Sequence, residues 1–155
     1  MLKDKKIGII GTGNMGQALI SGLVYSRSSI PENIICSDIR KEKLKLIKEE
    51  YGIVTKKSNV DVAKASDIII YAIKPQIMAS IMRETADCLD MNKLIISIAA
   101  GVPMAAIEAY LDKELRLIRV MPNIAASVKE SATAIAAGKN ATKSDIKVAK
   151  AIFDS

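Results

Sequence analysis

A short glycine-rich stretch near the N-terminus constrains this chain more than any other feature. An apolar run over residues 7–10 leads into it, and a helical pattern follows at once. The stretch reads Gly11, Thr12, Gly13, Asn14, Met15 and Gly16. The first glycine can form a tight turn, the second leaves the backbone open to a pyrophosphate, and the third lets a helix pack closely on the strand. The free N–H groups and positive dipole at the start of that helix would stabilise a phosphate without any lysine.

The surrounding sequence separates this stretch from other phosphate-binding loops. Kinase glycine loops lie between two strands, and the kinase catalytic loop needs a histidine, which this chain lacks. A P-loop would need Gly-Lys followed by Ser or Thr, and that run does not occur. Asp38 follows Gly16 by 22 positions, close to where dinucleotide-binding folds carry an acidic residue. The stretch therefore predicts a dinucleotide site, and the alternative is a glycine turn that binds nothing.

Composition narrows the class of protein further. The 155 residues predict one domain, long enough to bury a substantial core. Half of the residues are apolar but only 3% are aromatic, so we expect an aliphatic core of the kind found in parallel sheets covered on both faces. The 23 Lys and Arg residues exceed the 17 Asp and Glu residues, but they are spread along the chain. We therefore expect solvated helix faces, a mild attraction for anions and no nucleic-acid partner.

The cysteines and the apolar stretches indicate a soluble protein. Cys36 and Cys88 lie far apart and form no Cys-x-x-Cys pair, so we expect both to be reduced, buried small residues, and we expect no metal site. The longest mainly apolar stretch, residues 94–107, is interrupted by polar, glycine and proline residues and is too short for a membrane span. The residues before the glycine stretch leave no room for a signal-peptide core. We expect a cytoplasmic protein without a membrane partner.

The apolar periodicities predict strands alternating with helices along the whole chain. We expect strands at residues 6–10, 33–37, 53–55, 67–73, 93–99, 115–121 and 131–137. We expect helices at residues 15–27, 41–51, 58–65, 75–89, 103–111 and 142–155. The fourth helix should turn Ile77, Ile81, Thr85 and Leu89 inward. This alternation predicts an α/β fold, a doubly wound, mostly parallel, Rossmann-like sheet ordered 3-2-1-4-5-6 with an extra edge strand.

In such a sheet, ligands bind outside the carboxyl ends of the strands. At the end of the second strand, Asp38 can accept both hydroxyls of an adenosine ribose and repel a 2′-phosphate. The neighbouring Ser37, Arg40 and Lys41 can instead hold that phosphate. Both arrangements are present, so NADH and NADPH remain alternatives. Arg40 and Lys41 can equally be the solvated start of a helix.

Two further strand ends offer candidate cofactor contacts. The fourth strand ends in Ala72, Ile73, Lys74 and Pro75. Here the backbone and the lysine can lie beside the cofactor's ribose and nicotinamide, or the segment simply ends a strand and begins a helix. The fifth strand ends in Ala99, Ala100 and Gly101. A flat ring can lie against these small residues, and tight packing is an equal alternative.

Two asparagines are the remaining candidates. The sixth strand ends in Met121-Pro122-Asn123, and the amide of Asn123 has the donor and acceptor that suit a nicotinamide carboxamide. A Pro-Asn pair is also an ordinary turn. Asn59 is either part of a helix cap or a contact to the adenosine end.

Together these segments resemble pyrroline-5-carboxylate reductase, the last enzyme of proline synthesis. The resemblance rests on the runs Ile7–Gly16, Ala72–Gln76, Ile95–Gly101 and Arg119–Asn123, covers nearly the whole chain, and is most specific in the last two runs. It implies that hydride from NADPH or NADH reduces a cyclic imine, 1-pyrroline-5-carboxylate, to L-proline. A protonated C=N accepts hydride readily, so the site mainly needs to position its reactants. This is consistent with a chain that lacks histidine, and no catalytic residue is assigned.

The chain departs from the family pattern in two respects. Ile124-Ala125 stand where the family usually has Thr-Pro, so a hydroxyl near the nicotinamide is missing. Family members also carry a second, all-helical domain that forms the homo-oligomer and supplies much of the imine and carboxylate pocket. The sequence ends at Ser155, so we expect that domain to be absent and residues 1–155 to be a cofactor-binding domain that is inactive alone. The alternatives are a non-catalytic or regulatory NAD(P)-binding relative, and a reductase of the same superfamily acting on another imine or carbonyl.

Overall fold

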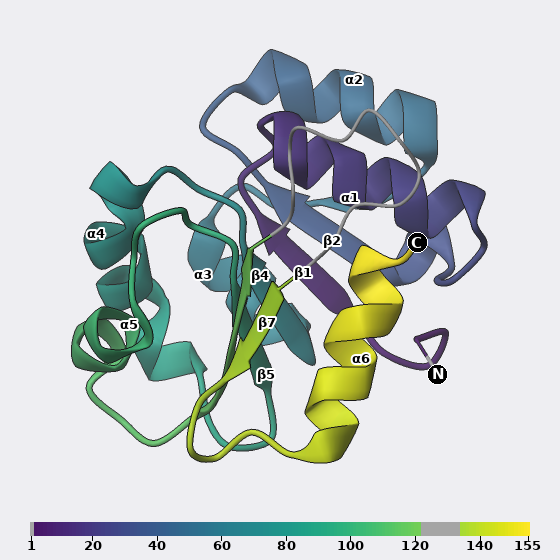
Figure 1. The fold of residues 1–155 in the computed structure, drawn as a ribbon. Coiled ribbons are helices and arrows are strands. Elements are labelled where there is room, and N and C mark those ends of the chain that lie inside the picture. The colour runs from purple at the N-terminus through teal and green to yellow at the C-terminus, as the bar shows by residue number, and fades with distance from the viewer. Residues whose placement is uncertain (1, 122–133) are drawn as a thin grey trace.

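The computed structural model describes residues 2–121 and 134–155, and within them one sheet has helices on both faces (Figure 1). The strands are β1 (Ile7–Ile10), β2 (Ile34–Ser37), β3 (Val54–Thr55), β4 (Ile68–Tyr71), β5 (Leu94–Ser97), β6 (Arg116–Met121) and β7 (Ala134–Ala137). The α-helices are α1 (Asn14–Tyr25), α2 (Lys41–Tyr51), α3 (Asn59–Ala65), α4 (Pro75–Thr85), α5 (Met104–Leu111) and α6 (Lys143–Phe153). Two 3-10 turns are η1 (Pro31–Asn33) and η2 (Ala86–Cys88).

The strand order confirms the topology predicted from the sequence. The strands lie in the order β3-β2-β1-β4-β5-β6-β7, which brings β1 next to both β2 and β4. The pairs from β3 to β6 are parallel, whereas β7 runs antiparallel to β6 and forms the extra edge strand. The carboxyl ends of the parallel strands therefore meet at one edge of the sheet, where the candidate site residues were expected. Residues 131–133 of the predicted seventh strand lie outside the described residues.

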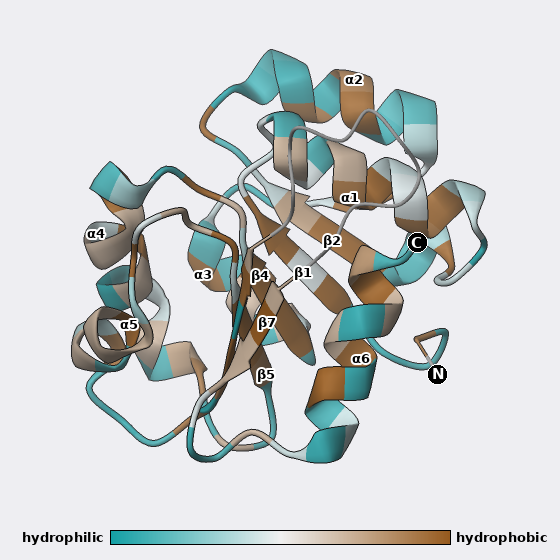
Figure 2. Ribbon diagram, in the orientation of Figure 1, coloured by the Kyte–Doolittle hydropathy of each residue, from teal (hydrophilic) through white to brown (hydrophobic). Residues whose placement is uncertain are grey.

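The sheet separates two hydrophobic cores. Side chains of α1, α2 and α6 pack on one face of the sheet, and those of α3, α4 and α5 pack on the other. Successive residues of β4 alternate between the two cores: Ile68 and Ile70 face the first, Ile69 and Tyr71 the second. All four are buried, which explains why the central strands are continuous apolar runs rather than alternating ones (Figure 2).

The fourth helix differs from the sequence prediction in its end and in its buried face. It stops at Thr85 and continues as the short η2 turn. Met78 and Met82 are fully buried, whereas Ile77 is 46% exposed, so the prediction that Ile77 points inward was wrong. Apolar side chains on α4 form a broad face that includes both the Ile77 side and the Met78 side of the helix. The sequence alone does not show which side packs against the sheet. Thr85 and Leu89 are buried as expected.

A partly buried ion pair fixes the last helix to the sheet. Thr142 and Asp145 form a reciprocal capping box at the start of α6, and α6 ends at Phe153, slightly before the predicted end. The carboxylate of Asp145 also accepts hydrogen bonds from Nε and Nη2 of Arg116 on β6, at 3.2 and 3.0 Å. Nη1 of Arg116 donates to the carbonyl of Met91, just before β5. One guanidinium thus joins a helix, a strand and a loop.

We expect the variant Asp145→Ala to lower the free energy of unfolding by about 3 kcal/mol, because it leaves the partly buried Arg116 charge without a partner and removes a helix cap. The measurement is urea unfolding followed by circular dichroism. The matched control is Glu114→Ala, which breaks the exposed Lys139–Glu114 pair, in which both side chains are more than 70% exposed. Equal midpoints for Asp145→Ala and the control would contradict a stabilising role for the buried pair.

Candidate functional site

Among residues 2–121 and 134–155, packing around the glycine loop leaves an open approach at its centre. Gly11 has φ +98°, and a Cβ atom there would press on the carbonyl of Ala72. A Cβ atom on Gly16 would collide with the carbonyl of Gly11, so α1 starts in direct contact with the end of β1. A Cβ atom on Gly13, in contrast, would meet no heavy atom of the described residues within 4 Å. The loop is closely packed at its two ends and open in the middle.

In the described part of the chain, the start of α1 has no capping side chain and can receive an anion. Its N-cap is Gly13, which has no side chain to accept from the first-turn N–H groups, and the first turn contains no acidic residue. Four N–H groups at a helix start have no partner within the helix, and the helix dipole makes this end positive. The open approach at Gly13 leads to this helix start, which is the geometry of a phosphate site.

Asp38 directly follows β2, and its carboxylate accepts hydrogen bonds from Thr12 in the glycine loop and from Arg40. Its Oδ2 accepts hydrogen bonds from the backbone N and the Oγ1 of Thr12, at 2.9 and 2.6 Å. Its Oδ1 accepts from the backbone N and the Nε of Arg40, at 2.9 and 3.0 Å. Nη2 of Arg40 donates to Oδ2 at 3.1 Å. The structure therefore brings together three of the predicted site residues, and it does so through the carboxylate that was predicted to bind ribose.

These bonds fix the charge of the site. Partial burial alone would raise the pKa of Asp38, but the hydrogen bonds from Arg40 and Thr12 outweigh it and hold that pKa far below its usual range. A carboxylate with a lowered pKa stays ionised at neutral pH, and its stabilising contribution is lost only as the pH falls through that lowered value. Asp38 and Arg40 therefore form a charged pair throughout the neutral range.

Ser37 and Asn59 are joined to one another beside this pair. The Ser37 hydroxyl is buried and donates to Oδ1 of Asn59 at 2.7 Å. Asn59 is the first residue of α3, while Ser58 is its cap and accepts from the N–H of Asp61. The Asn59 side chain thus binds the last residue of β2 and does not cap α3. Lys41, the other predicted phosphate residue, is exposed at the start of α2.

The ends of β4 and β5 lie along the same edge of the sheet. The backbone N of Ala72 donates to Ile10, and that of Ile98 donates to Tyr71, so the ends of β1, β4 and β5 follow one another in space. Lys74 is exposed and precedes α4, whose first residue is Pro75. The segment Ala99–Gly101 leaves Ala100 and Gly101 exposed, with Gly101 at φ +74°. Pro122 and Asn123, with Ile124-Ala125, lie outside the described residues.

Arg119 is a polar residue at this edge that the sequence analysis did not select. It lies on β6 in register with Ser97 on β5 and Ala136 on β7. Its Nε is buried and has no hydrogen-bond partner among the described residues, while its Nη2 lies 3.5 Å from the sulfur of Met121. The signal that the sequence offered was a charged residue between the apolar residues Ile118 and Val120 of this strand.

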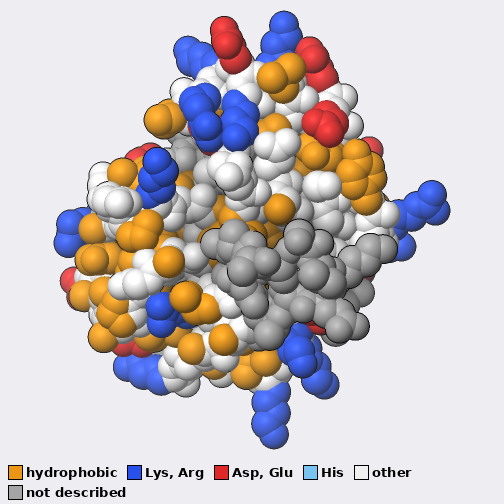
Figure 3. Space-filling view, turned by 45° about the horizontal axis from the view of Figure 1, so that its top comes forward, with side chains coloured by type: hydrophobic (Ala, Val, Ile, Leu, Met, Phe, Trp, Pro, Cys, Tyr) orange, Lys and Arg blue, Asp and Glu red, His pale blue; other side chains and the backbone are white. Residues whose placement is uncertain are grey.

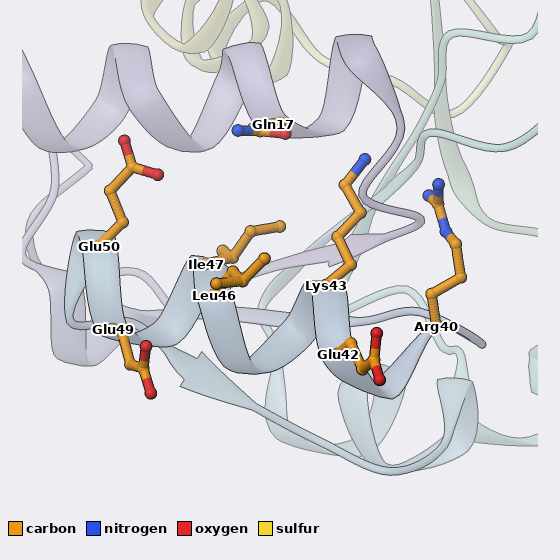
Figure 4. A pocket seen from close by; sticks show the side chains of 8 residues that line it. All are labelled: Gln17, Arg40, Glu42, Lys43, Leu46, Ile47, Glu49 and Glu50. Atoms are coloured by element: carbon orange, nitrogen blue, oxygen red, sulfur yellow. The ribbon is translucent and has the colours of Figure 1, made fainter.

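A groove of about 820 Å³ opens between α1 and α2, next to the glycine loop. It is lined by Gln17, Arg40, Glu42, Lys43, Leu46, Ile47, Glu49 and Glu50. In Figure 4 the side chains of Lys43 and Glu50 rise from α2 toward α1, with Arg40 beside Lys43 at the end nearest the loop. Basic side chains elsewhere are scattered over the face seen in Figure 3 rather than gathered in one patch. Within residues 2–121 and 134–155, no group of three or more His, Cys, Asp or Glu side chains could hold a metal ion.

The comparisons with known proteins agree with this geometry. Residues 6–101 match the family model described as NADP oxidoreductase, coenzyme F420-dependent. The pyrroline-5-carboxylate reductase of Methanosarcina acetivorans is 44% identical over 154 residues, which are 99% of this chain and 57% of that protein. The chain thus spans little more than half the length of the curated relatives it matches.

Two solved structures share the fold along almost the whole chain. The pyrroline-5-carboxylate reductase of Coxiella burnetii has a TM-score of 0.91 and 32% identity, covering 97% of this chain and 56% of that one. The Plasmodium falciparum pyrroline carboxylate reductase with NADP bound has a TM-score of 0.86 and 28% identity, covering 99% of this chain and 56% of that one. The resemblance drawn from the sequence motifs is confirmed.

We expect Gly13→Val to fold normally and to lose dinucleotide binding. Its backbone is extended and the new side chain has space, but that space is the approach to the helix start. The matched control is Gly16→Val, which should destabilise the fold because its side chain meets the Gly11 carbonyl. Calorimetric titration with NADPH and NADH, together with thermal unfolding, measures both effects. Unchanged affinity in a folded Gly13→Val variant would contradict a pyrophosphate site at this loop.

The two cysteines should differ in reactivity. Burial, with a smaller contribution from the Asp38 charge, raises the pKa of Cys36 to about 12. Cys88 is only partly buried, so the prediction that both cysteines are buried was wrong for Cys88. Because the thiolate is the reactive form, a thiol reagent at pH 8 should modify Cys88 first and Cys36 only after denaturation. Mass spectrometry of the modified protein distinguishes the two sites. Rapid modification of Cys36 in the folded protein would contradict its complete burial in β2.

Proposed function

Since this chain belongs to the NADP oxidoreductase, coenzyme F420-dependent family, and its relatives include pyrroline-5-carboxylate reductases, we propose that it is the cofactor-binding part of such a reductase. The reaction is the transfer of a hydride from NADPH or NADH to 1-pyrroline-5-carboxylate, which gives L-proline. The observation that carries the proposal is the open helix start at Gly13, set between two glycines that backbone packing requires.

The residues along this edge suit the successive parts of a dinucleotide. The pyrophosphate would lie against the N–H groups at the start of α1, over Gly13. The adenosine end would lie toward the end of β2, near Asp38, Arg40 and Asn59. The nicotinamide would lie toward the ends of β4 and β5, against the segments Ala72–Pro75 and Ala99–Gly101. We propose Pro122 and Asn123 as further contacts on that side.

The chain's own residues would bind and orient rather than exchange protons. The bound dinucleotide would supply the hydride, and a protonated imine is already an acceptor for it. Ala100 and Gly101 are exposed among the described residues, so a flat ring would have room against the end of β5. The buried ends of β4 and β5 beneath it exclude water from one side of the ring. No described residue is assigned as a general acid.

We further propose that residues 1–155 form one wall of the reaction cleft. As the family resemblance implies, a helical domain would complete the pocket for the imine and its carboxylate, and would also join the subunits of a homo-oligomer. The substrate is a small molecule, and we propose that the protein works in the cytoplasm without nucleic-acid or membrane partners. Among the described residues, none of the helices has the length and apolar character needed to cross a bilayer.

We expect the 155-residue chain to bind NADPH or NADH but to reduce the imine far more slowly than an intact relative. Holding the reactants in place contributes about 7–11 kcal/mol to barrier lowering, and a substrate lying on one open wall loses most of this. The assay is oxidation of NADPH or NADH that depends on 1-pyrroline-5-carboxylate. A rate near that of an intact relative would show that the substrate pocket lies within this chain. Complementation of a proline auxotroph by the full gene distinguishes a reductase from a non-catalytic relative.

A further inference from the structure

The Asp38 carboxylate has no acceptor capacity left for a ribose. It accepts five hydrogen bonds, two from Thr12 and three from Arg40, at distances from 2.6 to 3.1 Å. A carboxylate offers about four lone-pair positions, so both oxygens are saturated. The Asp38 side chain is also only 6% exposed. To receive two ribose hydroxyls, it would have to give up its bonds to the loop or to the guanidinium.

We propose that Asp38 is a positioning residue, which holds Thr12 of the glycine loop and Arg40 in place, and that Arg40 is the residue that receives the 2′-phosphate of NADPH. This inference rests on the proposed function, because it assumes a dinucleotide at the glycine loop. It deepens that proposal by selecting NADPH over NADH. An acidic residue after the second strand suggests a carboxylate that binds the ribose hydroxyls and repels a 2′-phosphate. Here the carboxylate instead holds the arginine that would bind that phosphate.

Arg40 has the geometry needed to bind a phosphate while it is held by Asp38. It uses only Nε and one hydrogen of Nη2 in the pair, so three of its five N–H donors make no bond to the described residues. The side chain is 54% exposed, in contrast to the buried carboxylate that orients it. Guanidinium donors in a fixed plane match the oxygens of a phosphate.

A second basic residue lies beside Arg40. Lys43 is one helical turn further along α2, and in Figure 4 it rises next to Arg40 at the loop end of the groove. No salt bridge joins Lys43 to another described residue within 4.0 Å. Ser37, which the sequence offered as a phosphate ligand, has its hydroxyl proton committed to Asn59. Arg40 and Lys43 are therefore the better candidates for the phosphate.

The same carboxylate connects the phosphate site to the glycine loop. The N–H and the hydroxyl of Thr12 both point to Asp38, which fixes the loop one residue before Gly13. A change at Asp38 should therefore disturb the pyrophosphate site, which NADPH and NADH share. If Asp38 instead bound the ribose hydroxyls, replacing it would behave differently. It should weaken the binding of NADH and, by removing a charge that repels the 2′-phosphate, strengthen the binding of NADPH.

The test is calorimetric titration of the 155-residue chain and its variants with NADPH and with NADH. Arg40→Ala should weaken NADPH by about tenfold or more, the size expected for charge-assisted hydrogen bonds, without weakening NADH. Asp38→Asn, which keeps the shape of the side chain, should weaken both. The matched control is Lys45→Ala on the exposed surface of α2, which removes one charge away from the groove and should leave both affinities unchanged.

Three results would overturn the inference: stronger NADPH binding with weaker NADH binding in Asp38→Asn, equal losses in Arg40→Ala and Lys45→Ala, or weaker NADH binding in Arg40→Ala. Thr12→Val, which removes only the hydroxyl bond to Asp38, gives a second test. In the double variant with Asp38→Asn, the two losses of NADH binding free energy should not add, because both changes break the same hydrogen-bond network. A loss equal to the sum of the two single losses would contradict this coupling. Thermal unfolding confirms that each variant is folded. A wild-type chain that binds neither cofactor would refute the proposed function itself.

Discussion

β1 lies in close contact with helices on both faces of the sheet, and this contact sets the spacing of the whole fold. On one side, α1 begins so near the end of β1 that a side chain at Gly16 would collide with the Gly11 carbonyl. On the other, a Cβ atom on Gly8 would meet Val62 and Ser66 of the α3 region. Because β1 is an inner strand of the sheet, these contacts fix the distance between the sheet and the helices on both of its faces. They also aim the start of α1 along the carboxyl edge.

Asp145 and Asp38 make the same kind of ion pair with an arginine, but the first pair stabilises the fold and the second lies at the candidate binding site. Asp145 and Asp38 each accept from a threonine backbone N–H and from the Nε and Nη2 of an arginine. Nη1 of Arg116 donates to the carbonyl of Met91, and the Arg116 side chain is 27% exposed. Arg40 keeps its outer edge free and is 54% exposed. The first pair holds the fold together, and the second presents a cation at the candidate site.

The sequence predicted the features that arise from local patterns. Continuous apolar runs such as Ile68–Tyr71 indicated strands buried on both faces, and the spacing of Thr142 and Asp145 indicated the start of the last helix. The glycine spacing indicated where a ligand would bind. Long-range pairings were not predictable, since no pattern shows that Asp38 saturates itself with Thr12, 26 residues away, or that Arg116 meets Asp145, 29 residues away. The inward face of α4 was missed for a related reason, because the sheet selects Met78 over its neighbour Ile77.

We propose that a dinucleotide lies along the carboxyl ends of the strands, across the start of α1. Backbone amide NMR of the chain titrated with NADPH tests this most directly. We expect the largest shifts at residues 11–16 and 38–40, smaller ones at 72–75 and 99–101, and none at 90–93, in the loop that precedes the amino end of β5. Shifts that were absent, or that centred on residues 90–93, would contradict it.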